Sequence, residues 1–423
     1  MNYKKHTLKN GLRVLFVPMK DAQTVTVLAL TGTGSRYETR KTNGLAHFLE
    51  HMFFKGTKKR PTAMDISHEL DAVGGAYNAY TGKDRTGYWA KVDAKHAMTA
   101  LDVVSDIFLN AKIEQKEINK ERGPILQEIN MYEDMPMRRV GEIFEQLMYG
   151  DHPLGWDIAG PKQNIHDLMR EDFLEYLRTN YVTTNTAICV AGNFSEKKIL
   201  AKITKDFAKM STAPRPSYKP FVNSQKAPAL HVQNKKTDQT QLFVGVRSYG
   251  ADHKDRYVVS VIAAILGGGM SSRLFSEVRE KRGLAYFVRA FTERYPEEGY
   301  LGVQAGVEHE NLDAALTVIL SELKKLRRTR VSAKELKKVK EFMKGSLVMG
   351  LETTDDIATY IVEQEVIKDE VILPHTAMKN IDRVSAADVQ RVAKDIITNK
   401  GLNCAIIGPH KAGTARIKKL LKF

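Results

Sequence analysis

The pattern of apolar and polar positions predicts short strands and amphipathic helices that alternate along the chain. In "HTLKNGLRVLFVP" an apolar run is broken by Asn10-Gly11, which is typical of a hairpin turn, and "TVTVLALTGT" alternates as a strand does. Helical periodicity follows in "TAMDISHELDAVGG" and "HAMTALDVVSDIFLNA", and two strands flank Gly82 in "AYNAYTGKDRTGYWAKV". This mixture indicates an α+β fold.

The order of predicted elements repeats in the second half of the chain. A strand (QLFVGVRSY), an apolar helix (YVVSVIAAILGGG), a strand pair and a long helix follow one another, and "LNCAIIGPH" ends this half as "AICVAGNF" ends the first. Residues 211–228 contain four prolines and little apolar periodicity, which is typical of a linker. We therefore expect two similar domains, 1–210 and 229–423, each a mainly antiparallel sheet covered by helices.

Composition places the chain among ordinary globular proteins. Of its 423 residues, 43% are hydrophobic and 27% are charged. No apolar stretch approaches the ~20 residues that a membrane helix needs. Near the N-terminus, Asn10, Gly11 and Arg13 interrupt any signal-peptide core. We therefore expect a cytoplasmic protein that does not interact with a membrane.

Charge and cysteine content narrow the possible chemistry. The net charge is +15, but the lysines are spread along the chain and no RNA-binding motif is present, which favours a solvated basic exterior over nucleic-acid binding. The two cysteines, Cys189 and Cys404, lie in apolar strand-like runs, so neither a disulfide framework nor a cysteine-based zinc site is expected. The positive charge also predicts that strongly basic peptides are poor substrates.

The segment "GLAHFLEHMFFKGT", residues 44–57, places ionisable side chains on a mainly apolar helix, where burying them is costly unless something binds them. His47 and His51 are four residues apart and so lie on one helical face, a spacing that suits two zinc ligands. Glu50 lies beside them, where it can take a proton from a zinc-bound water. The order His-x-x-Glu-His is the inverse of the commoner His-Glu-x-x-His and is a signature of zinc peptidases. By itself, the motif is equally compatible with paired core histidines beside an ion-paired glutamate.

A third protein ligand is required, and "EINKERGPILQEINMYEDMP" offers Glu121 and Glu128 on one helical face. Taken alone, this segment is also compatible with a solvated charged helix. Joined to the first motif, it resembles peptidase family M16, M16B type, the family of pitrilysin, insulin-degrading enzyme and the mitochondrial processing peptidase. The resemblance implies one Zn²⁺ per chain, held by His47, His51 and Glu128, with Glu121 supporting the site from the outer shell.

One feature departs from the family pattern. Gly123-Pro124 interrupts the segment between the two glutamates, and a proline cannot complete the hydrogen bond to the carbonyl of Lys120. The sequence therefore predicts that the helix begins or kinks there, which puts the role of Glu121 in question.

The resemblance extends to two further segments. "GAYNAYTGKDRTGYWAKV", otherwise interpreted as a plain edge hairpin, is similar to the family's substrate-binding edge strand; Asn78 would bind peptide backbone, and Ala79 and Tyr80 would line the cleft. "GGGMSSRLFSEVREKRGLAYFVRAF" lacks the pattern of a phosphate loop and resembles the family's Arg/Tyr motif. Arg279 and Tyr286 would then stabilise the oxyanion of the tetrahedral intermediate.

The resemblance covers essentially the whole chain and implies a LuxS/MPP-like fold that forms half of a clamshell. The activity it implies is that of a zinc endopeptidase acting on unfolded peptides or short polypeptides. Because the largest members join four such domains, it also implies a homodimer, with a heterodimer as the alternative. A non-catalytic scaffold subunit and one subunit of a heterodimeric processing peptidase are competing functions; the intact motif disfavours the first, and the basic charge disfavours presequence processing.

Overall fold

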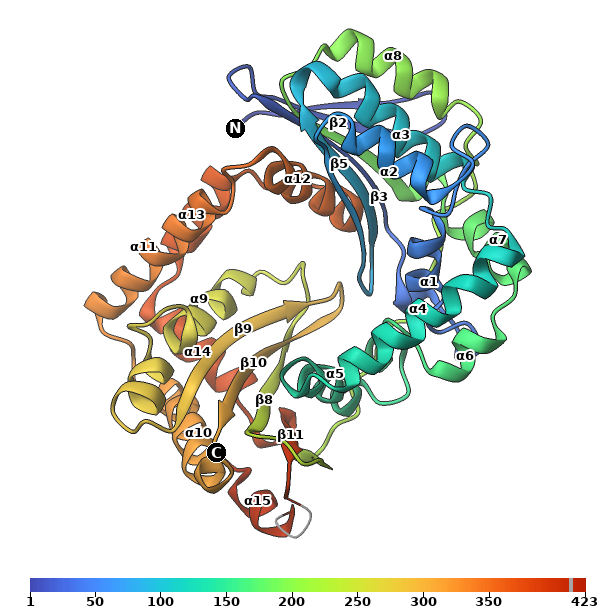
Figure 1. Ribbon diagram of the computed structural model, residues 1–423. Coiled ribbons are helices and arrows are strands. Elements are labelled where there is room, and N and C mark those ends of the chain that lie inside the picture. Colours follow the sequence, from blue (N-terminus) through green and yellow to red (C-terminus); the bar gives the residue numbers. More distant parts are fainter. Residues whose placement is uncertain (411–413) are drawn as a thin grey trace. The chain divides into compact units, whose positions relative to one another are not determined.

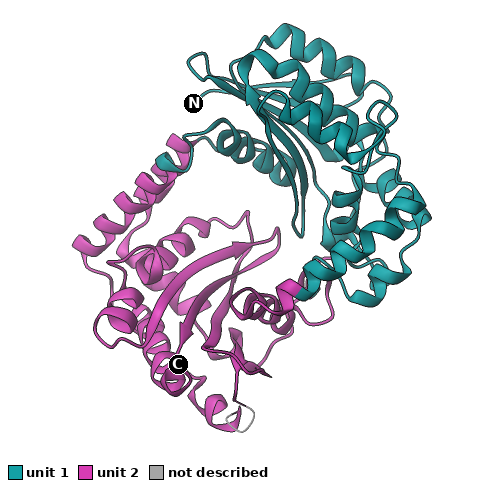
Figure 2. Cartoon of the chain, in the orientation of Figure 1, with its two compact units in different colours: residues 1–130, 156–219, 348–373 teal, residues 131–155, 220–347, 374–423 magenta. Residues whose placement is uncertain are grey.

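The computed structural model describes residues 1–410 and 414–423, which form two compact units (Figures 1 and 2). Unit 1 comprises residues 1–130, 156–219 and 348–373, and unit 2 comprises residues 131–155, 220–347 and 374–423. The expected α+β fold with two domains is confirmed. The units differ from the contiguous division expected at 211–228. Residues 131–155 of the first half belong to unit 2, and residues 348–373 of the second half belong to unit 1.

Unit 1 is built on a six-stranded sheet in the order β1-β2-β6-β3-β5-β4. The β2 and β6 strands run parallel, and the other neighbouring pairs run antiparallel. The β1–β2 hairpin predicted around Asn10-Gly11 is present. The β4 strand lies at an edge of the sheet. The strands are β1 (Lys4–Thr7), β2 (Arg13–Pro18), β3 (Thr24–Thr31), β4 (Ala76–Thr81), β5 (Thr86–Asp93) and β6 (Thr186–Gly192).

Helices cover both faces of this sheet (Figure 1). One face carries the main core, which includes buried residues of α1 and α3, and the other face packs against α12. The helices of unit 1 are α1 (Leu45–Met52), α2 (Ala63–Asp71), α3 (Ala97–Asn110), α4 (Gln115–Glu133), α6 (Lys162–Asp167), α7 (Arg170–Asn180), α8 (Glu196–Asp206) and α12 (Thr354–Lys368).

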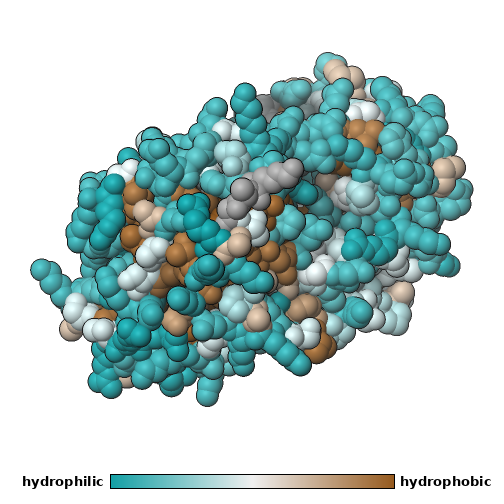
Figure 3. All heavy atoms as spheres, turned by 90° about the horizontal axis from the view of Figure 1, so that it is seen from below, coloured by the Kyte–Doolittle hydropathy of each residue, from teal (hydrophilic) through white to brown (hydrophobic). Residues whose placement is uncertain are grey.

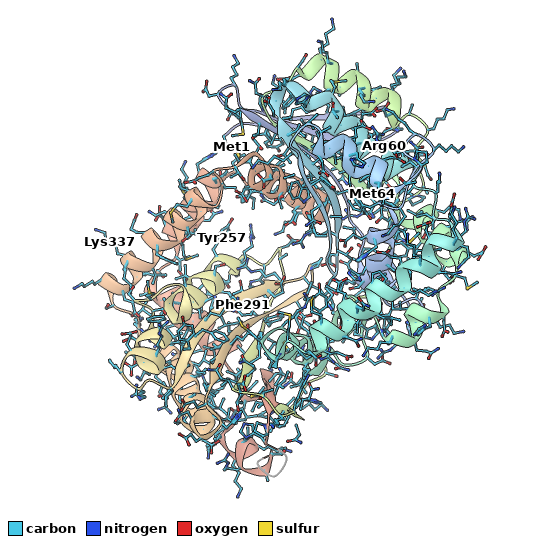
Figure 4. The ribbon with its side chains drawn as sticks, in the orientation of Figure 1. Met1, Arg60, Met64, Tyr257, Phe291 and Lys337 are labelled. Atoms are coloured by element: carbon cyan, nitrogen blue, oxygen red, sulfur yellow. The ribbon has the colours of Figure 1, made fainter. Side chains whose placement is uncertain are left out.

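A buried ion network joins the loop after α1 to α2 and α3. Arg60, labelled in Figure 4, is 2% exposed, and its guanidinium lies 2.6 Å from both Glu69 and Asp102 and 2.8 Å from Asp106. Thr57 donates to the same Asp106 carboxylate at 2.6 Å. Because a buried charge is tolerated only when it is paired, the network fixes the chain that leaves α1.

Unit 2 repeats the arrangement with a five-stranded sheet in the order β7-β11-β8-β10-β9. The α9, α10 and α14 helices contribute to the core on one face, and α5 packs on the other. Its strands are β7 (Ala229–Asn234), β8 (Thr240–Tyr249), β9 (Ala285–Arg294), β10 (Glu298–Val307) and β11 (Leu402–Gly408); its helices are α5 (Pro136–Tyr149), α9 (Arg256–Gly267), α10 (Leu312–Arg328), α11 (Ala333–Met349), α13 (Pro374–Arg383), α14 (Ala386–Ile396) and α15 (Thr414–Leu420).

The two sheets have matching topologies, which confirms the duplication. The order β2-β6-β3-β5-β4 corresponds to β7-β11-β8-β10-β9, and each sheet has one parallel pair, β2–β6 or β7–β11. Every residue of β6 and of β11 is buried, so each sheet is covered on both faces. On the second face of each sheet, the covering helix comes from the other half of the chain. The α12 helix belongs to unit 1 and covers its sheet, and α5 belongs to unit 2 and covers its sheet (Figure 2).

The exterior is mainly polar. Hydrophilic side chains predominate on the face drawn in Figure 3, with smaller apolar patches between them. Among the described residues, no helix is both long and apolar enough to cross a membrane.

The cover supplied by α12 leads to a prediction about stability. Ile361 is 0% exposed against the sheet of unit 1, so Ile361→Ala is expected to lower the free energy of unfolding by about 2–4 kcal/mol. Met349→Ala, at a side chain that is 63% exposed, serves as the control and is expected to change it by less than about 0.5 kcal/mol. Urea unfolding measures both, and equal effects would show that α12 contributes no buried cover.

Candidate metal centre

The α1 helix presents the motif residues because its other faces are apolar and buried. Phe48 and Leu49 are 0% exposed within the core of unit 1. The helix begins after Gly44, whose φ of 102° lies in the left-handed region that favours glycine. On the remaining face, the ring centroids of His47 and His51 are 4.9 Å apart. The two imidazoles therefore lie together on one helical face, as expected, with their ring planes at 71° to one another.

The α4 helix runs without interruption from Gln115 to Glu133, so the prediction that it begins at Gly123-Pro124 is wrong. Both of these residues are exposed, as is Lys120, whose carbonyl loses its helical partner. Water can solvate that carbonyl, which explains why the helix tolerates the proline. Glu121 and Glu128 therefore lie on one continuous helix.

The structure brings His47, His51 and Glu128 together. Oε2 of Glu128 lies 3.5 Å from Nε2 of His47 and 3.4 Å from Nε2 of His51. One ligand atom from each of the three residues lies within 4.8 Å of the other two. The three side chains come from two helices of unit 1 that are separated by more than 60 residues in sequence.

Glu121 contacts the same site through the opposite nitrogen of His51. Its Oε1 lies 3.0 Å from Nδ1 of His51, and its Oε2 lies 2.5 Å from Nζ of Lys55. Burial raises the pKa of the Glu121 carboxyl, but the hydrogen bonds from His51 and Lys55 outweigh burial and hold the pKa below its usual value. An ionised Glu121 accepts from Nδ1–H, so in the neutral imidazole, the form that binds a metal, the lone pair of His51 is on Nε2, facing Glu128.

The cluster has the charge balance of a cation site. Burial lowers the pKa of His51, whereas hydrogen bonds to Glu121 and Glu128 raise it, with a net value of about 9. The carboxylates that favour a protonated imidazole here would equally favour a divalent cation. Nδ1 of His47 is buried and has no hydrogen-bond partner among the described residues.

The donor set and its spacing fit zinc. Two imidazoles and one carboxylate are ordinary catalytic zinc ligands, with a fourth position open. Zinc–ligand bonds of ~2.0–2.1 Å in a tetrahedron place neighbouring ligand atoms about 3.3–3.4 Å apart. The two nitrogen–oxygen separations at Glu128, 3.5 and 3.4 Å, are close to that value.

Glu50 lies beside the cluster and is held from the edge strand. Thr81, the last residue of β4, donates its hydroxyl to Oε2 of Glu50 at 2.6 Å. Thr81 follows Tyr80 directly in sequence and had no predicted role. This hydrogen bond fixes one carboxylate oxygen of Glu50 and connects the motif helix directly to β4.

The three predicted substrate-binding residues lie on β4, as expected for an edge strand. Asn78 is exposed, and its side-chain oxygen accepts from the backbone N–H of Ala79 at 2.9 Å. Tyr80 donates its hydroxyl to Oε1 of Glu363 on α12 at 3.2 Å. Burial, followed by the Glu363 charge, raises the pKa of Tyr80 well above its usual value, so the phenol stays neutral.

Arg279 and Tyr286 both lie in unit 2. The guanidinium carbon of Arg279 is 4.9 Å from the centroid of the Tyr286 ring, and Tyr286 is 75% exposed. Arg282 instead pairs with Glu277 at 2.6 Å. The structure therefore places the predicted Arg/Tyr pair together, in a unit separate from the metal cluster.

The chain is similar to proteins described as zinc proteases. Two family models match the chain in succession: Insulinase (Peptidase family M16) over residues 13–162, and Peptidase M16 inactive domain over residues 167–343. The chain is 34% identical to the uncharacterized zinc protease YmxG of Bacillus subtilis, over 93% of this chain and 96% of that protein. It is 33% identical to an uncharacterized zinc protease of Streptomyces coelicolor, over 96% and 90% of the two chains.

Solved structures share the fold. A protease from Helicobacter pylori has a TM-score of 0.89 at 23% identity, covering 96% of this chain and 99% of its own. A peptidase M16 inactive domain from Pseudomonas fluorescens has a TM-score of 0.88 at 18% identity, covering 97% and 98%. The chain belongs to peptidase family M16.

The contact between Glu121 and His51 leads to a prediction about metal affinity. Glu121→Gln removes the anion that orients His51, so we expect zinc to bind about 10–100-fold more weakly. Glu117→Gln makes the same chemical change one turn earlier on α4 and is expected to leave affinity unchanged. Competition with a chromophoric chelator measures both, and identical affinities would show that Glu121 does not support the site.

Proposed function

We propose that this chain is a zinc-dependent endopeptidase of the M16B type that hydrolyses unfolded peptides or short polypeptides. The observation that carries the proposal is the meeting of two imidazoles and a carboxylate beside a further, separately held carboxylate, Glu50. Relatives described as zinc proteases support the choice of metal. The complete ligand set argues against a non-catalytic scaffold, although residues 167–343 match a domain described as inactive.

The residues divide the chemistry between them. A zinc ion held by His47, His51 and Glu128 would polarise the scissile carbonyl and make a neighbouring water more acidic. Glu50 takes the proton from the attacking water and later delivers it to the leaving amine. The hydrogen bond from Thr81 holds the Glu50 carboxylate in one orientation while it does so.

An extended peptide would bind along β4. The strand ends its sheet, so a peptide can add to it through main-chain hydrogen bonds. Asn78 would bind the peptide backbone, and Ala79 and Tyr80 would line the cleft. Arg279 and Tyr286, a cation and a phenol, would stabilise the oxyanion.

We further propose a homodimer whose chains enclose the substrate in a clamshell chamber, with Arg279 and Tyr286 donated to the metal centre of the other chain. A heterodimer with a related chain is the alternative. The homodimer is favoured because this one chain carries both the metal cluster and the Arg/Tyr pair.

Glu50→Gln tests the chemistry directly. Removing the base is expected to lower kcat on an unstructured quenched peptide at least about a hundredfold, with zinc content unchanged, because Glu50 is not one of the three ligands. Glu196→Gln, at a half-buried residue paired with Lys4, is the matched control and should retain full activity. A wild type that binds zinc but cuts no peptide would contradict the endopeptidase function and favour a non-catalytic scaffold.

Complementation tests the dimer. A heterodimer of a Glu50→Gln chain and an Arg279→Ala chain can be purified through two different tags. If each site takes Glu50 from one chain and Arg279 from the other, one of its two sites contains both wild-type residues. We expect it to retain about half of the wild-type activity, whereas each variant homodimer is inactive. An inactive heterodimer would show that each site takes both groups from a single chain.

A further inference from the structure

We propose that Glu38 is a positioning residue for the metal centre: its buried carboxylate holds the first turn of α1 and thereby sets the directions of His47, Glu50 and His51. The inference rests on the function proposed for that site. Glu38 precedes the motif by nine residues and was not singled out from the sequence.

The carboxylate of Glu38 is surrounded by N–H donors from the start of α1. Oε1 accepts from the backbone N–H of Ala46 at 2.6 Å, and Oε2 accepts from the backbone N–H of Gly44 at 2.9 Å. The side-chain amide of Asn43 donates to Oε2 as well, at 2.9 Å. Glu38 is 5% exposed, so these donors take the place of water.

The helix has no other side-chain cap. Gly44 occupies the N-cap position and supplies no side chain, so the Ala46 N–H depends on Glu38. Burial raises the pKa of Glu38 to about 8, although the hydrogen bonds from Asn43, Ala46 and Gly44 act to lower it, so the carboxyl group anchors α1 through its accepting oxygens rather than through a permanent charge. Because α1 has only eight residues and carries three site residues, a small shift of its first turn displaces the whole cluster.

The residues just before Glu38 are anchored to the turn between β4 and β5. The backbone N–H of Ser35 bonds to the carbonyl of Gly82 at 3.2 Å, and that of Arg36 bonds to the carbonyl of Lys83 at 2.9 Å. The side chains of Arg36 and Asp84 add a buried ion pair at 3.3 Å. Glu38 therefore joins the metal-bearing helix to the hairpin that contains the edge strand β4.

The hydrogen bond between Thr81 and Glu50 makes a second link between the same two elements. One link holds the start of α1 through Glu38, and the other holds its last turn. Two separated links fix both the position and the rotation of α1 relative to β4, whereas one would leave a rotation free.

The test compares Glu38→Gln with the wild type and with Glu322→Gln. The glutamine places an amide N–H₂ where the site supplies only donors, so it cannot replace both accepting oxygens. Glu322 is 4% exposed in unit 2, and its variant removes a buried carboxylate without touching α1. The readouts, taken below the melting temperature of all three proteins, are the zinc dissociation constant, amide exchange of residues 44–52, and kcat and KM separately.

We expect Glu38→Gln to weaken zinc binding about tenfold or more, to speed amide exchange across α1, and to lower kcat with KM within about twofold. The control is expected to change none of these, even if it melts earlier. The inference would be overturned if a folded Glu38→Gln variant had the zinc affinity, amide exchange and kcat of the wild type. It would also be overturned if Glu322→Gln changed these quantities as much as Glu38→Gln does. If Glu38→Gln does not fold, Glu38→Asp, which keeps the carboxyl group on a shorter side chain, is measured in its place.

A failure of the proposed function is distinguishable. In that case the wild type would cut no peptide, whether or not it binds zinc. Amide exchange of residues 44–52 would still decide whether Glu38 holds α1.

Discussion

The candidate site depends on the contact between α1 and α4. Each helix supplies a pair of polar side chains at its own helical spacing, imidazoles from α1 and carboxylates from α4. The pairs interlock, since Glu121 takes one nitrogen of His51 while Glu128 faces the other. Neither pair would tolerate burial alone, because an unpaired carboxylate or imidazole in such surroundings is costly. The contact therefore pairs these groups for stability and at the same time forms the candidate metal site.

The remaining features of unit 1 hold this contact in register with the edge strand. Glu38 holds the start of α1, Thr81 holds Glu50, and the Arg60 network fixes the chain that leaves the helix. Each link uses a buried or half-buried polar group whose partner comes from another element. A peptide bound along β4 would therefore lie in a fixed relation to Glu50, as general base catalysis requires.

Local patterns predicted much of this organisation. The strands, the repeated order and the spacing within each motif follow from periodicity and from turn residues such as Gly11, whose φ of 86° lies in the left-handed region that favours glycine. The same local patterns could not predict how elements far apart in sequence pack against one another. The continuity of α4 depends on Pro124 facing solvent, and the exchange of α5 and α12 depends on the second apolar face of each sheet. The fully apolar run of β6 signals a doubly covered sheet, yet no spacing shows which helix covers it.

The central claim is that His47, His51 and Glu128 hold a single zinc ion. The most direct test is anomalous diffraction from crystals of the zinc-loaded protein, with data collected on both sides of the zinc absorption edge. The account predicts one anomalous peak per chain, about 2.0–2.2 Å from Nε2 of both histidines and from a Glu128 oxygen. A zinc-loaded crystal with no peak between these three side chains, or with its peak elsewhere, would contradict it.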